Sequence, residues 1–431
     1  MKIFPLLDPT SPIRNKLLSP MVQMAVLAKQ SRSPGSVMDI LNDFDESKGA
    51  EFQKKWVQAF GHKAVGDLAT IPVCFEGVSI IASKFLERWA RPGCCEKSTR
   101  MQKFSGDSFV VSDEVSTEMC NLAYRSYETY DRLLPRVRDH LSETTALNEK
   151  AIERKAFDIC RGLLPAGTAT NLALVACVRD LVEIIQVAKV HPLKEIRTIG
   201  GKLQESIMDM CGPVIEACKG IPWMEQWEIQ QNPTLTVPSD SFHRPVMMIK
   251  GPKVRDQKVF FEKISVMHGM DPIDFAIAMN ERPADSEVPD VFKGLHYSFR
   301  IITDYGSFRD LQRHRRCDQV VFPLTTDFGF DIPDEIKYSA IGVEYEETLE
   351  QFESHPKRQI GVLNDQYAIP LAFKNCSVFS MDAKELYYIC ELRTKPQGHI
   401  NYRRIAWDMF LQASQSGYEH MRWCRAVNPN V

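Results

Sequence analysis

The sequence lacks the features of secreted and membrane proteins. None of its twelve cysteines forms a C-x-x-C pair, and their spacings show no even framework, so we expect free thiols in a reducing compartment. Pro5 and Asp8 interrupt any apolar leader near the amino end, and no run of about 18 apolar residues occurs anywhere. We therefore predict a cytoplasmic protein.

An excess of charge of either sign is also absent. The 53 lysines and arginines are nearly balanced by 56 aspartates and glutamates, which leaves a net charge of −3. No global field recruits nucleic acid or an anionic membrane, so any anion binding must be local. We expect neither nucleic acid nor a membrane among the partners. With 431 residues the chain is long enough for two domains of ordinary size.

Apolar periodicity predicts an α/β protein in which helices and strands alternate. A polar, proline-bounded stretch without periodicity covers 230–239, which makes it the best candidate linker. Helical spacing or strand-like runs mark the remaining elements. The predicted helices lie over 1–60, 113–140 and 338–352, and the predicted strands over 71–81 and 297–302.

The order of these signals repeats on the two sides of the linker. Pro165 is followed fourteen residues later by Arg179, and Pro370 is followed fourteen residues later by Lys384. In each half we read an amphipathic helix, a proline break, a second helix and a basic turn, in that order. Such a repeat predicts two copies of one α/β unit, each a mixed sheet with packed long helices. The predicted copies are residues 1–232 and 240–431.

The densest basic stretch, 308–316, directly follows the second predicted strand. It reads F-R-D-L-Q-R-H-R-R and holds four arginines and a histidine. Four guanidiniums cannot be buried together without anionic partners, because each unpaired buried charge costs several kcal/mol. One interpretation is a solvated basic face on a helix. His314 and the planar fork of arginine favour the other interpretation, a site for phosphate or another oxyanion.

A charged cluster also occupies the matching place in the first copy, over 88–100. Glu96, Ser98 and Arg100 alternate there, so in an extended segment they would point to one side as acceptor, hydroxyl and cation. This trio suits a nucleotide, with Arg100 and Ser98 on its phosphate and Glu96 on its sugar or base. A surface turn is the alternative interpretation.

The same cluster contains two adjacent cysteines, Cys94 and Cys95. Neighbouring cysteines are poorly placed to close one tetrahedral metal site, and no histidine pair at metal spacing accompanies them. We expect ordinary thiols and no metal.

Together the two clusters resemble the signature of the flavin-dependent thymidylate synthases (ThyX), R-H-R-x-x-S-x-N-E-x-S-x-R-Y. Arg313-His314-Arg315 is similar to its R-H-R half, and Glu96-x-Ser98-x-Arg100 is similar to its E-x-S-x-R half. The whole chain most resembles the tandem members of this family, which hold two such units in one polypeptide. Shorter similarities are Gly61-His62, Arg161-x-x-Leu164-Pro165, the stretch 366–371, and Glu391-Leu392-Arg393.

Each copy departs from the family pattern. In the first copy R-H-R has become Arg88-Trp89-Ala90, and in the second 316–321 replaces the E-x-S-x-R half. Family sites are assembled from several subunits of a tetramer. The resemblance therefore implies copies that complement each other, half the number of sites, and a homodimer that forms a pseudo-tetramer. Further altered family positions are Gly93, Cys95, Met101, Asn171 and Cys376.

The resemblance implies reductive methylation of dUMP at C5, with FAD as the redox carrier, NADPH as the reductant and methylene-tetrahydrofolate as the carbon donor. The family uses no cysteine nucleophile, so the protein must contribute positioning and electrostatics. The implied catalytic residues are Arg100 and Arg393. The implied substrate-binding residues are Glu96, Lys97, Ser98, Thr99, Arg100, Gln312 and Arg393. The implied cofactor-binding residues are His62, Arg88, Glu96, Arg313, His314 and Arg315.

Two other functions stay open at this point. The same fold could transfer a methyl or hydroxymethyl group to another pyrimidine nucleotide. Alternatively, the altered signature could belong to a homologue that binds a nucleotide or a flavin without turnover.

Overall fold

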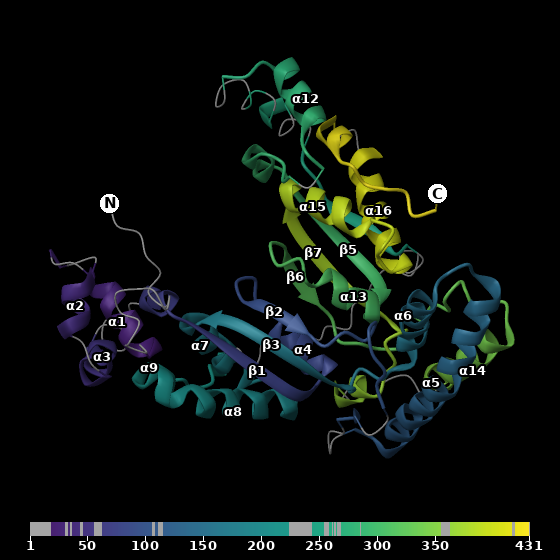
Figure 1. Cartoon of the computed structure of the whole chain (residues 1–431), viewed down its shortest axis with the longest axis horizontal. Coiled ribbons are helices and arrows are strands. Elements are labelled where there is room, and N and C mark those ends of the chain that lie inside the picture. Colours follow the sequence, from purple (N-terminus) through teal and green to yellow (C-terminus); the bar gives the residue numbers. More distant parts are fainter. Residues whose placement is uncertain are drawn as a thin grey trace. The chain divides into compact units, whose positions relative to one another are not determined.

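The computed structural model of the chain forms two compact units that are not continuous in sequence (Figure 1). The first unit combines 1–76, 91–96 and 171–231, and the second combines 77–90, 97–170 and 232–431. The described residues are 19–30, 33–34, 37–43, 46–55, 63–105, 108–110, 115–223, 244–253, 258–260, 262, 264, 269–284, 286–354, 363–415 and 419–430.

The first unit is built on the sheet β1-β3-β2. Strand β3 alternates buried and exposed positions, with Leu172 and Leu174 buried, as period-two patterning requires. It pairs antiparallel with β2, so that Gly93 lies opposite Val175 and Glu96 opposite Leu172. The elements are α1 (Pro20–Gln30), α2 (Val37–Asp43), α3 (Glu46–Gln53), β1 (Thr70–Ser79), β2 (Gly93–Glu96), β3 (Ala169–Cys177), α7 (Val178–Ala188), α8 (Lys194–Cys211) and α9 (Pro213–Glu216).

The second unit is built on the antiparallel sheet β4-β5-β7-β6. Helices α15 and α16 cover one face of β5 and β7 (Figure 1), where Phe299 and Phe379 are buried opposite each other. The elements are α4 (Ile80–Leu86), α5 (Thr117–Thr144), α6 (Glu149–Cys160), β4 (Val246–Lys250), α12 (Pro272–Glu281), β5 (His296–Asp304), α13 (Tyr305–Leu311), β6 (Asp318–Val321), α14 (Ala340–Glu353), β7 (Lys374–Asp382), α15 (Ala383–Arg393) and α16 (Ile400–Gln415).

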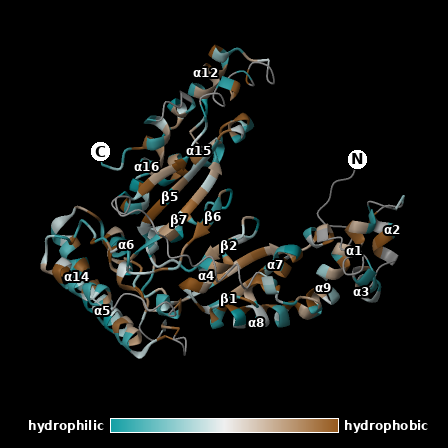
Figure 2. Ribbon diagram, turned by 180° about the vertical axis from the view of Figure 1, so that it is seen from behind, coloured by the Kyte–Doolittle hydropathy of each residue, from teal (hydrophilic) through white to brown (hydrophobic). Residues whose placement is uncertain are grey.

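The long amphipathic helices α5 and α14 pack together in the second unit. Ser116 caps α5 by accepting a hydrogen bond from the Met119 N–H at 3.3 Å, which satisfies one orphan donor at the helix start. Polar and apolar residues are mixed along both helices (Figure 2), and each turns its apolar side inward. Across the contact, Thr348 donates to Thr129 at 3.2 Å, while Glu344 pairs with arginines of α5.

The predicted repeat appears as an internal two-fold relationship. Pro165 and Pro370 form an isolated antiparallel bridge, and the segments around them exchange reciprocal backbone hydrogen bonds. These bonds run from Leu371 N to Leu164 O, from Ala166 N to Ile369 O, from Ala372 N to Gly162 O, and from Gly167 N to Tyr367 O. Exchanging the two segments turns the first bond into the second and the third into the fourth. Pro165 and Pro370 are therefore equivalent positions.

The same equivalence extends to the elements on either side. Strand β3 and helix α7 correspond to β7 and α15, and α4 and β2 correspond to α13 and β6, because each pair has the same length and order. Strands β3 and β7 were not predicted, because a helix was expected directly after each proline. The strand pairs of established register are all antiparallel, although we expected mixed sheets.

The predicted linker over 230–239 lies outside the described residues. The compact second unit takes segments from both sides of it. The division into copies at 1–232 and 240–431 therefore stays a prediction, distinct from the compact units.

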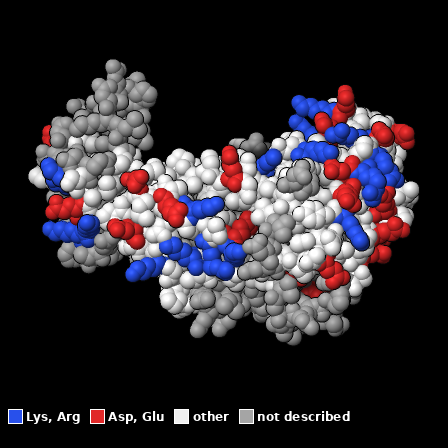
Figure 3. Space-filling model, turned by 90° about the horizontal axis from the view of Figure 1, so that it is seen from below, with Lys and Arg blue, Asp and Glu red and all other residues white. Residues whose placement is uncertain are grey.

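Charge is distributed without a dominant sign. On the face in view in Figure 3, acidic and basic side chains are interspersed, as the net charge of −3 implies. None of the helices in the described part of the chain is long and apolar enough to cross a bilayer.

Candidate functional site

The candidate site lies in the second unit, where residues of both copies meet. Its first component is the loop after β2. The strand ends at Glu96, and Thr99 and Arg100 form a turn, in which the Ser98 hydroxyl accepts the Arg100 N–H at 3.2 Å. The expected extended row of Glu96, Ser98 and Arg100 is therefore wrong, because Ser98 uses its hydroxyl to close a local turn.

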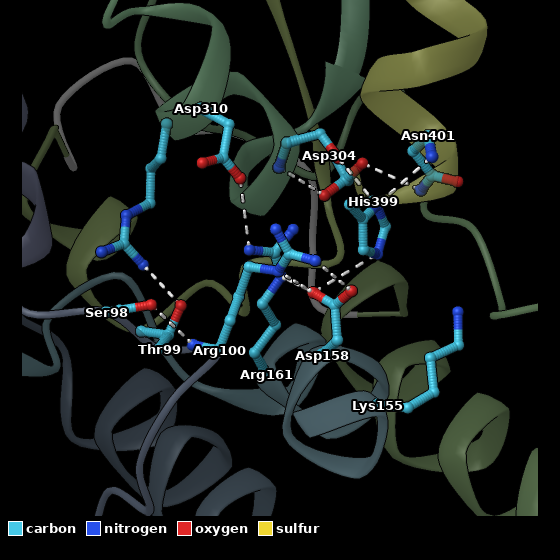
Figure 4. Close-up of polar contacts among 12 residues, drawn as sticks. Ser98, Thr99, Arg100, Lys155, Asp158, Arg161, Asp304, Asp310, His399 and Asn401 are labelled. Carbon is cyan, nitrogen blue, oxygen red and sulfur yellow. Dashed lines mark hydrogen bonds and ion pairs between the residues drawn. The ribbon is translucent and has the colours of Figure 1, made fainter. Parts of the chain in front are cut away.

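Arg100 is held by a carboxylate of α6. Its Nε donates to Oδ1 of Asp158 at 2.8 Å and its Nη2 donates to Oδ2 at 3.1 Å, a bidentate arrangement (Figure 4). Arg161 Nε lies 3.4 Å from the same Oδ1. Burial would raise the pKa of Asp158, but Arg161, His399 and Arg100 outweigh it and lower that pKa. Asp158 is therefore an anion at neutral pH.

A second buried carboxylate, Asp310 on α13, lies on the other side of Arg161. Arg161 Nη1 is 3.5 Å from its Oδ2, and Arg313 Nη1 is 3.8 Å from its Oδ1. Burial opposes ionisation of Asp310, yet Arg161, Arg313, Arg393 and Arg100 together lower its pKa. Four arginines from both copies thus gather around these two carboxylates.

The helix α13 also contacts the first copy directly. Arg309 Nη1 donates to the Thr99 hydroxyl at 3.1 Å, and Gln312 Nε2 donates to the Lys84 carbonyl at 2.9 Å. Arg309 and Gln312 are buried, as is His314. The basic stretch is therefore divided: Arg309 and His314 are buried, whereas Arg313 and Arg316 are exposed.

The histidine of the R-H-R stretch has a defined tautomer. Arg393 Nε donates to His314 Nε2 at 2.8 Å, so Nε2 is an acceptor and the proton lies on Nδ1, which donates to Glu385 at 3.1 Å. Burial lowers the pKa of His314, Glu385 opposes this, and Arg393 lowers the pKa further. A neutral imidazole therefore orients Arg393 at the end of α15.

A polar chain leads from Asp158 to the start of α13. His399 Nε2 lies 4.0 Å from Asp158, and its Nδ1 accepts the Asn401 N–H at 3.2 Å. The Asn401 side chain in turn donates to Asp304 at 2.9 Å (Figure 4), and Asp304 caps α13 by accepting the Ser307 N–H. The Asn401 and Asp304 side chains thus link His399, which lies near Asp158, to the start of α13.

The equivalent position of the other copy has a different composition. Arg88 and Trp89, which correspond to Arg313 and His314, stack on each other with the guanidinium carbon 4.6 Å from the ring. Phe85 stands where the second copy has Asp310, and Arg88 also lies 4.6 Å from its ring. Stacked aromatic rings and a buried Lys84–Glu87 ion pair thus occupy the position where the second copy has Asp310 and Arg313.

The remaining predicted residues are placed as follows. Lys97 lies over the Phe104 ring at 4.8 Å. Arg313 is exposed and Arg315 half-buried, so both guanidiniums reach the surface of the second unit. Glu96 is buried on β2 of the first unit. His62 lies outside the described residues.

Four residues of the cluster were not among the predicted site residues: Asp158, Arg161, Asp310 and His399. Arg161 was available from its A-R-x-x-L-P-like motif, and Asp310 lay within the basic stretch. Asp158 and His399 carry no motif, so only the fold identifies them.

The cysteines form no disulfide, and Cys317 donates to the His314 carbonyl at 2.8 Å. All twelve are free thiols, and Cys94 and Cys95 lie on β2, opposite Leu174 and Ala173. Within the described ranges, no group of three or more histidine, cysteine, aspartate or glutamate side chains could hold a metal ion.

Comparison with known families identifies the class of protein. The family model described as thymidylate synthase complementing protein, Thy1, matches residues 16–211 and 262–416. These segments cover more than half of the chain, so the chain belongs to this family. The match in two segments fits a tandem arrangement and confirms both the predicted resemblance and the predicted α/β fold.

Several known proteins are similar to this chain. A UPF0159 protein of Chlamydia pneumoniae is 28% identical over 89% of this chain and 82% of its own length. A UPF0159 protein of Thermoplasma acidophilum is 24% identical over 85% of this chain and 86% of its own length.

Two solved structures also align with it. The flavin-dependent thymidylate synthase ThyX of Helicobacter pylori, complexed with FAD and dUMP, has a TM-score of 0.35 and 16% identity, over 47% of this chain and 96% of that one. The UMP/dUMP methylase PolB of Streptomyces cacaoi, bound with 5-Br dUMP, has a TM-score of 0.35 and 16% identity, over 46% of this chain and 89% of that one. The family assignment rests on the sequence match.

Proposed function

We propose that this protein is a flavin-dependent enzyme that methylates dUMP at C5, at a composite site built from both copies. The observation that carries the proposal is the convergence of four arginines around Asp158 and Asp310 in a member of the Thy1 family. Arg100 and Arg161 come from the first copy, and Arg313 and Arg393 from the second. Guanidiniums suit the phosphate of a nucleotide, because their planar fork can donate two hydrogen bonds to its oxygens.

The residues present fit a bound nucleotide. Arg161 is buried, and among the residues that the structure describes its Nη2 has no acceptor. A buried, unsatisfied guanidinium donor is costly unless an acceptor reaches it. A phosphate or a pyrimidine carbonyl oxygen supplies such an acceptor. Arg100, Arg161 and Arg393 would hold the nucleotide, and the positive field would stabilise negative charge that develops on the base.

FAD is the proposed cofactor, with Arg313 and Arg315 as its ligands. Their guanidiniums reach the surface and can pair with the pyrophosphate of a dinucleotide. When bound, a reduced flavin supplies the electrons for the reaction. NADPH and methylene-tetrahydrofolate are the proposed co-substrates: the methylene carbon moves to C5, the C5 proton leaves, and two electrons from NADPH reduce the transferred group to methyl, which leaves tetrahydrofolate and NADP⁺.

The proposed assembly is a homodimer in which two tandem chains stand in for four single units. Each chain then contributes one complete set of arginines. The equivalent position with Arg88 and Trp89 offers a stacked aromatic cluster in place of an anion site.

Flavin absorbance tests the proposal first. The purified protein should be yellow, and NADPH should bleach its absorbance near the flavin maximum. With 5-tritiated dUMP and methylene-tetrahydrofolate it should release tritium and form thymidylate. Bleaching with a different pyrimidine product would favour transfer of another one-carbon group. A colourless protein that FAD cannot reconstitute would contradict the proposal and favour a homologue without turnover.

A further inference from the structure

The pairing of Arg100 with Asp158 uses only part of the arginine. The bidentate contact engages Nε and Nη2, which leaves Nη1 and the second Nη2 proton on the outer edge of the guanidinium. Asp158 also meets Arg161 through Nε, at 3.4 Å. One carboxylate therefore contacts both arginines. Of the other Arg161 donors, Nη1 lies 3.5 Å from Asp310 and Nη2 has no acceptor among the described residues.

The position of Asp158 is itself fixed by the protein. Its side chain is 5% exposed, and it is held by the bidentate contact with Arg100 and by Arg161, with His399 4.0 Å away (Figure 4). A carboxylate held in this way restricts the rotamers of the arginines that it contacts. Such preorganisation reduces the entropy lost when a ligand binds.

The internal two-fold supplies a control within the same chain. The reciprocal bonds around Pro165 and Pro370 place Asp158 in correspondence with Leu363, and Arg161 with Gln366. The carboxylate is present where the arginine is present, and both are absent at the equivalent position.

We propose that Asp158 is a positioning residue, which holds Arg100 and Arg161 with their free donors converging on the phosphate of the nucleotide. This inference rests on the proposed function. It predicts that loss of the negative charge weakens the binding of a phosphorylated pyrimidine far more than that of the corresponding nucleoside. It also predicts that Asp158→Glu, which restores the carboxylate, recovers part of the affinity.

The test compares wild type with Asp158→Asn, Asp158→Glu and the control Glu153→Gln by calorimetric titration with dUMP and with deoxyuridine. Glu153 lies on the same helix and is 53% exposed, so its substitution removes a charge from α6 without touching the cluster. We expect Asp158→Asn to weaken dUMP binding at least tenfold and deoxyuridine binding less than threefold. Asp158→Glu should fall between wild type and Asp158→Asn, and Glu153→Gln should match wild type.

The outcomes separate the two proposals. If wild type binds dUMP no better than deoxyuridine, both the proposed function and this inference are overturned. If wild type prefers dUMP and Asp158→Asn keeps that preference, or if Asp158→Glu does not recover affinity, only the positioning role is overturned. Should Asp158→Asn fail to fold by circular dichroism, Asp158→Glu decides the question: a selective loss of dUMP affinity supports the role, and an unchanged affinity contradicts it.

Discussion

Arg309 of the second copy donates to the hydroxyl of Thr99 of the first at 3.1 Å. These residues lie 210 positions apart in the sequence, yet the contact joins the loop that carries Arg100 to the helix that carries Asp310. Thr99 and Arg100 of the first copy therefore lie beside α13 of the second copy within a single compact unit of one chain.

The exposed arginine of the R-H-R stretch should be needed for the flavin and not for folding. Arg313 is 48% exposed and its pair with Asp310 is long, at 3.8 Å, so Arg313→Ala should change stability by less than about 1 kcal/mol. It should reduce the flavin content of the purified protein at least tenfold, as measured by absorbance. Arg404→Ala, which removes an arginine paired with Asp334 at the surface, is the matched control. A fully yellow Arg313→Ala protein would contradict the assignment.

The number of flavins should equal the number of chains. The position equivalent to the R-H-R stretch is filled by the stacked Arg88 and Trp89, so titration with FAD should saturate at one per chain. Saturation at two FAD per chain would contradict the prediction that only one of the two copies binds the flavin. Light scattering of the same sample should give the mass of a dimer.

The buried arginine of the cluster should be needed for stability through its carboxylates. Arg161→Gln mimics the other copy, but it deprives Asp158 and Asp310 of a partner and should cost about 3–5 kcal/mol. Urea unfolding measures this loss. Because Leu363 accompanies Gln366 in the other copy, the double variant Arg161→Gln with Asp158→Leu should recover part of it. Equal stability of the single and double variants would argue against a coupled pair.

Stability should also fall on mild acidification, in part through His420. Burial lowers the pKa of His420 from 6.5 to about 4, so between these values the unfolded chain binds a proton that the folded chain does not. The contribution of His420 is therefore complete above about pH 6.5 and is lost as the pH falls toward 4, by about 3 kcal/mol.

Urea unfolding at pH 7.5 and 4.5 tests this dependence. His420→Gln removes the titrating group and should flatten the difference between the two pH values, whereas substitution of the exposed His296 should leave it unchanged. An identical pH dependence in wild type and His420→Gln would show that other groups account for the loss.

The sequence predicted the repeat and the long helices because these depend on local periodicity and on the order of signals. It predicted α5 over 113–140, close to the observed Thr117–Thr144. It missed β3, because Ala169–Cys177 mixes alanine and leucine, which suit a helix as well as a strand. The pairing of this segment with β2, which local sequence does not show, decides that it forms a strand.

The site was less predictable for a related reason. Arg313, His314 and Arg100 belong to motifs, but the acids that they need come from elsewhere. Asp158 is one of several acidic residues on α6, and nothing in the local sequence distinguishes it from Glu153. Its partner His399 follows α15, more than 200 residues later. Asp158 and His399 belong to the site because they are buried and pair with residues far away in the sequence. The spacing of residues along the chain shows neither property.

The covalent joining of two copies has a consequence for how such a site can change. In an assembly of identical chains, each substitution appears at every equivalent place, so a residue useful in one location is also imposed where it does harm. Here Trp89 and His314 occupy equivalent places in one polypeptide, and each can change alone. Fusion thus lets each half keep a different part of the charged cluster and lose the rest.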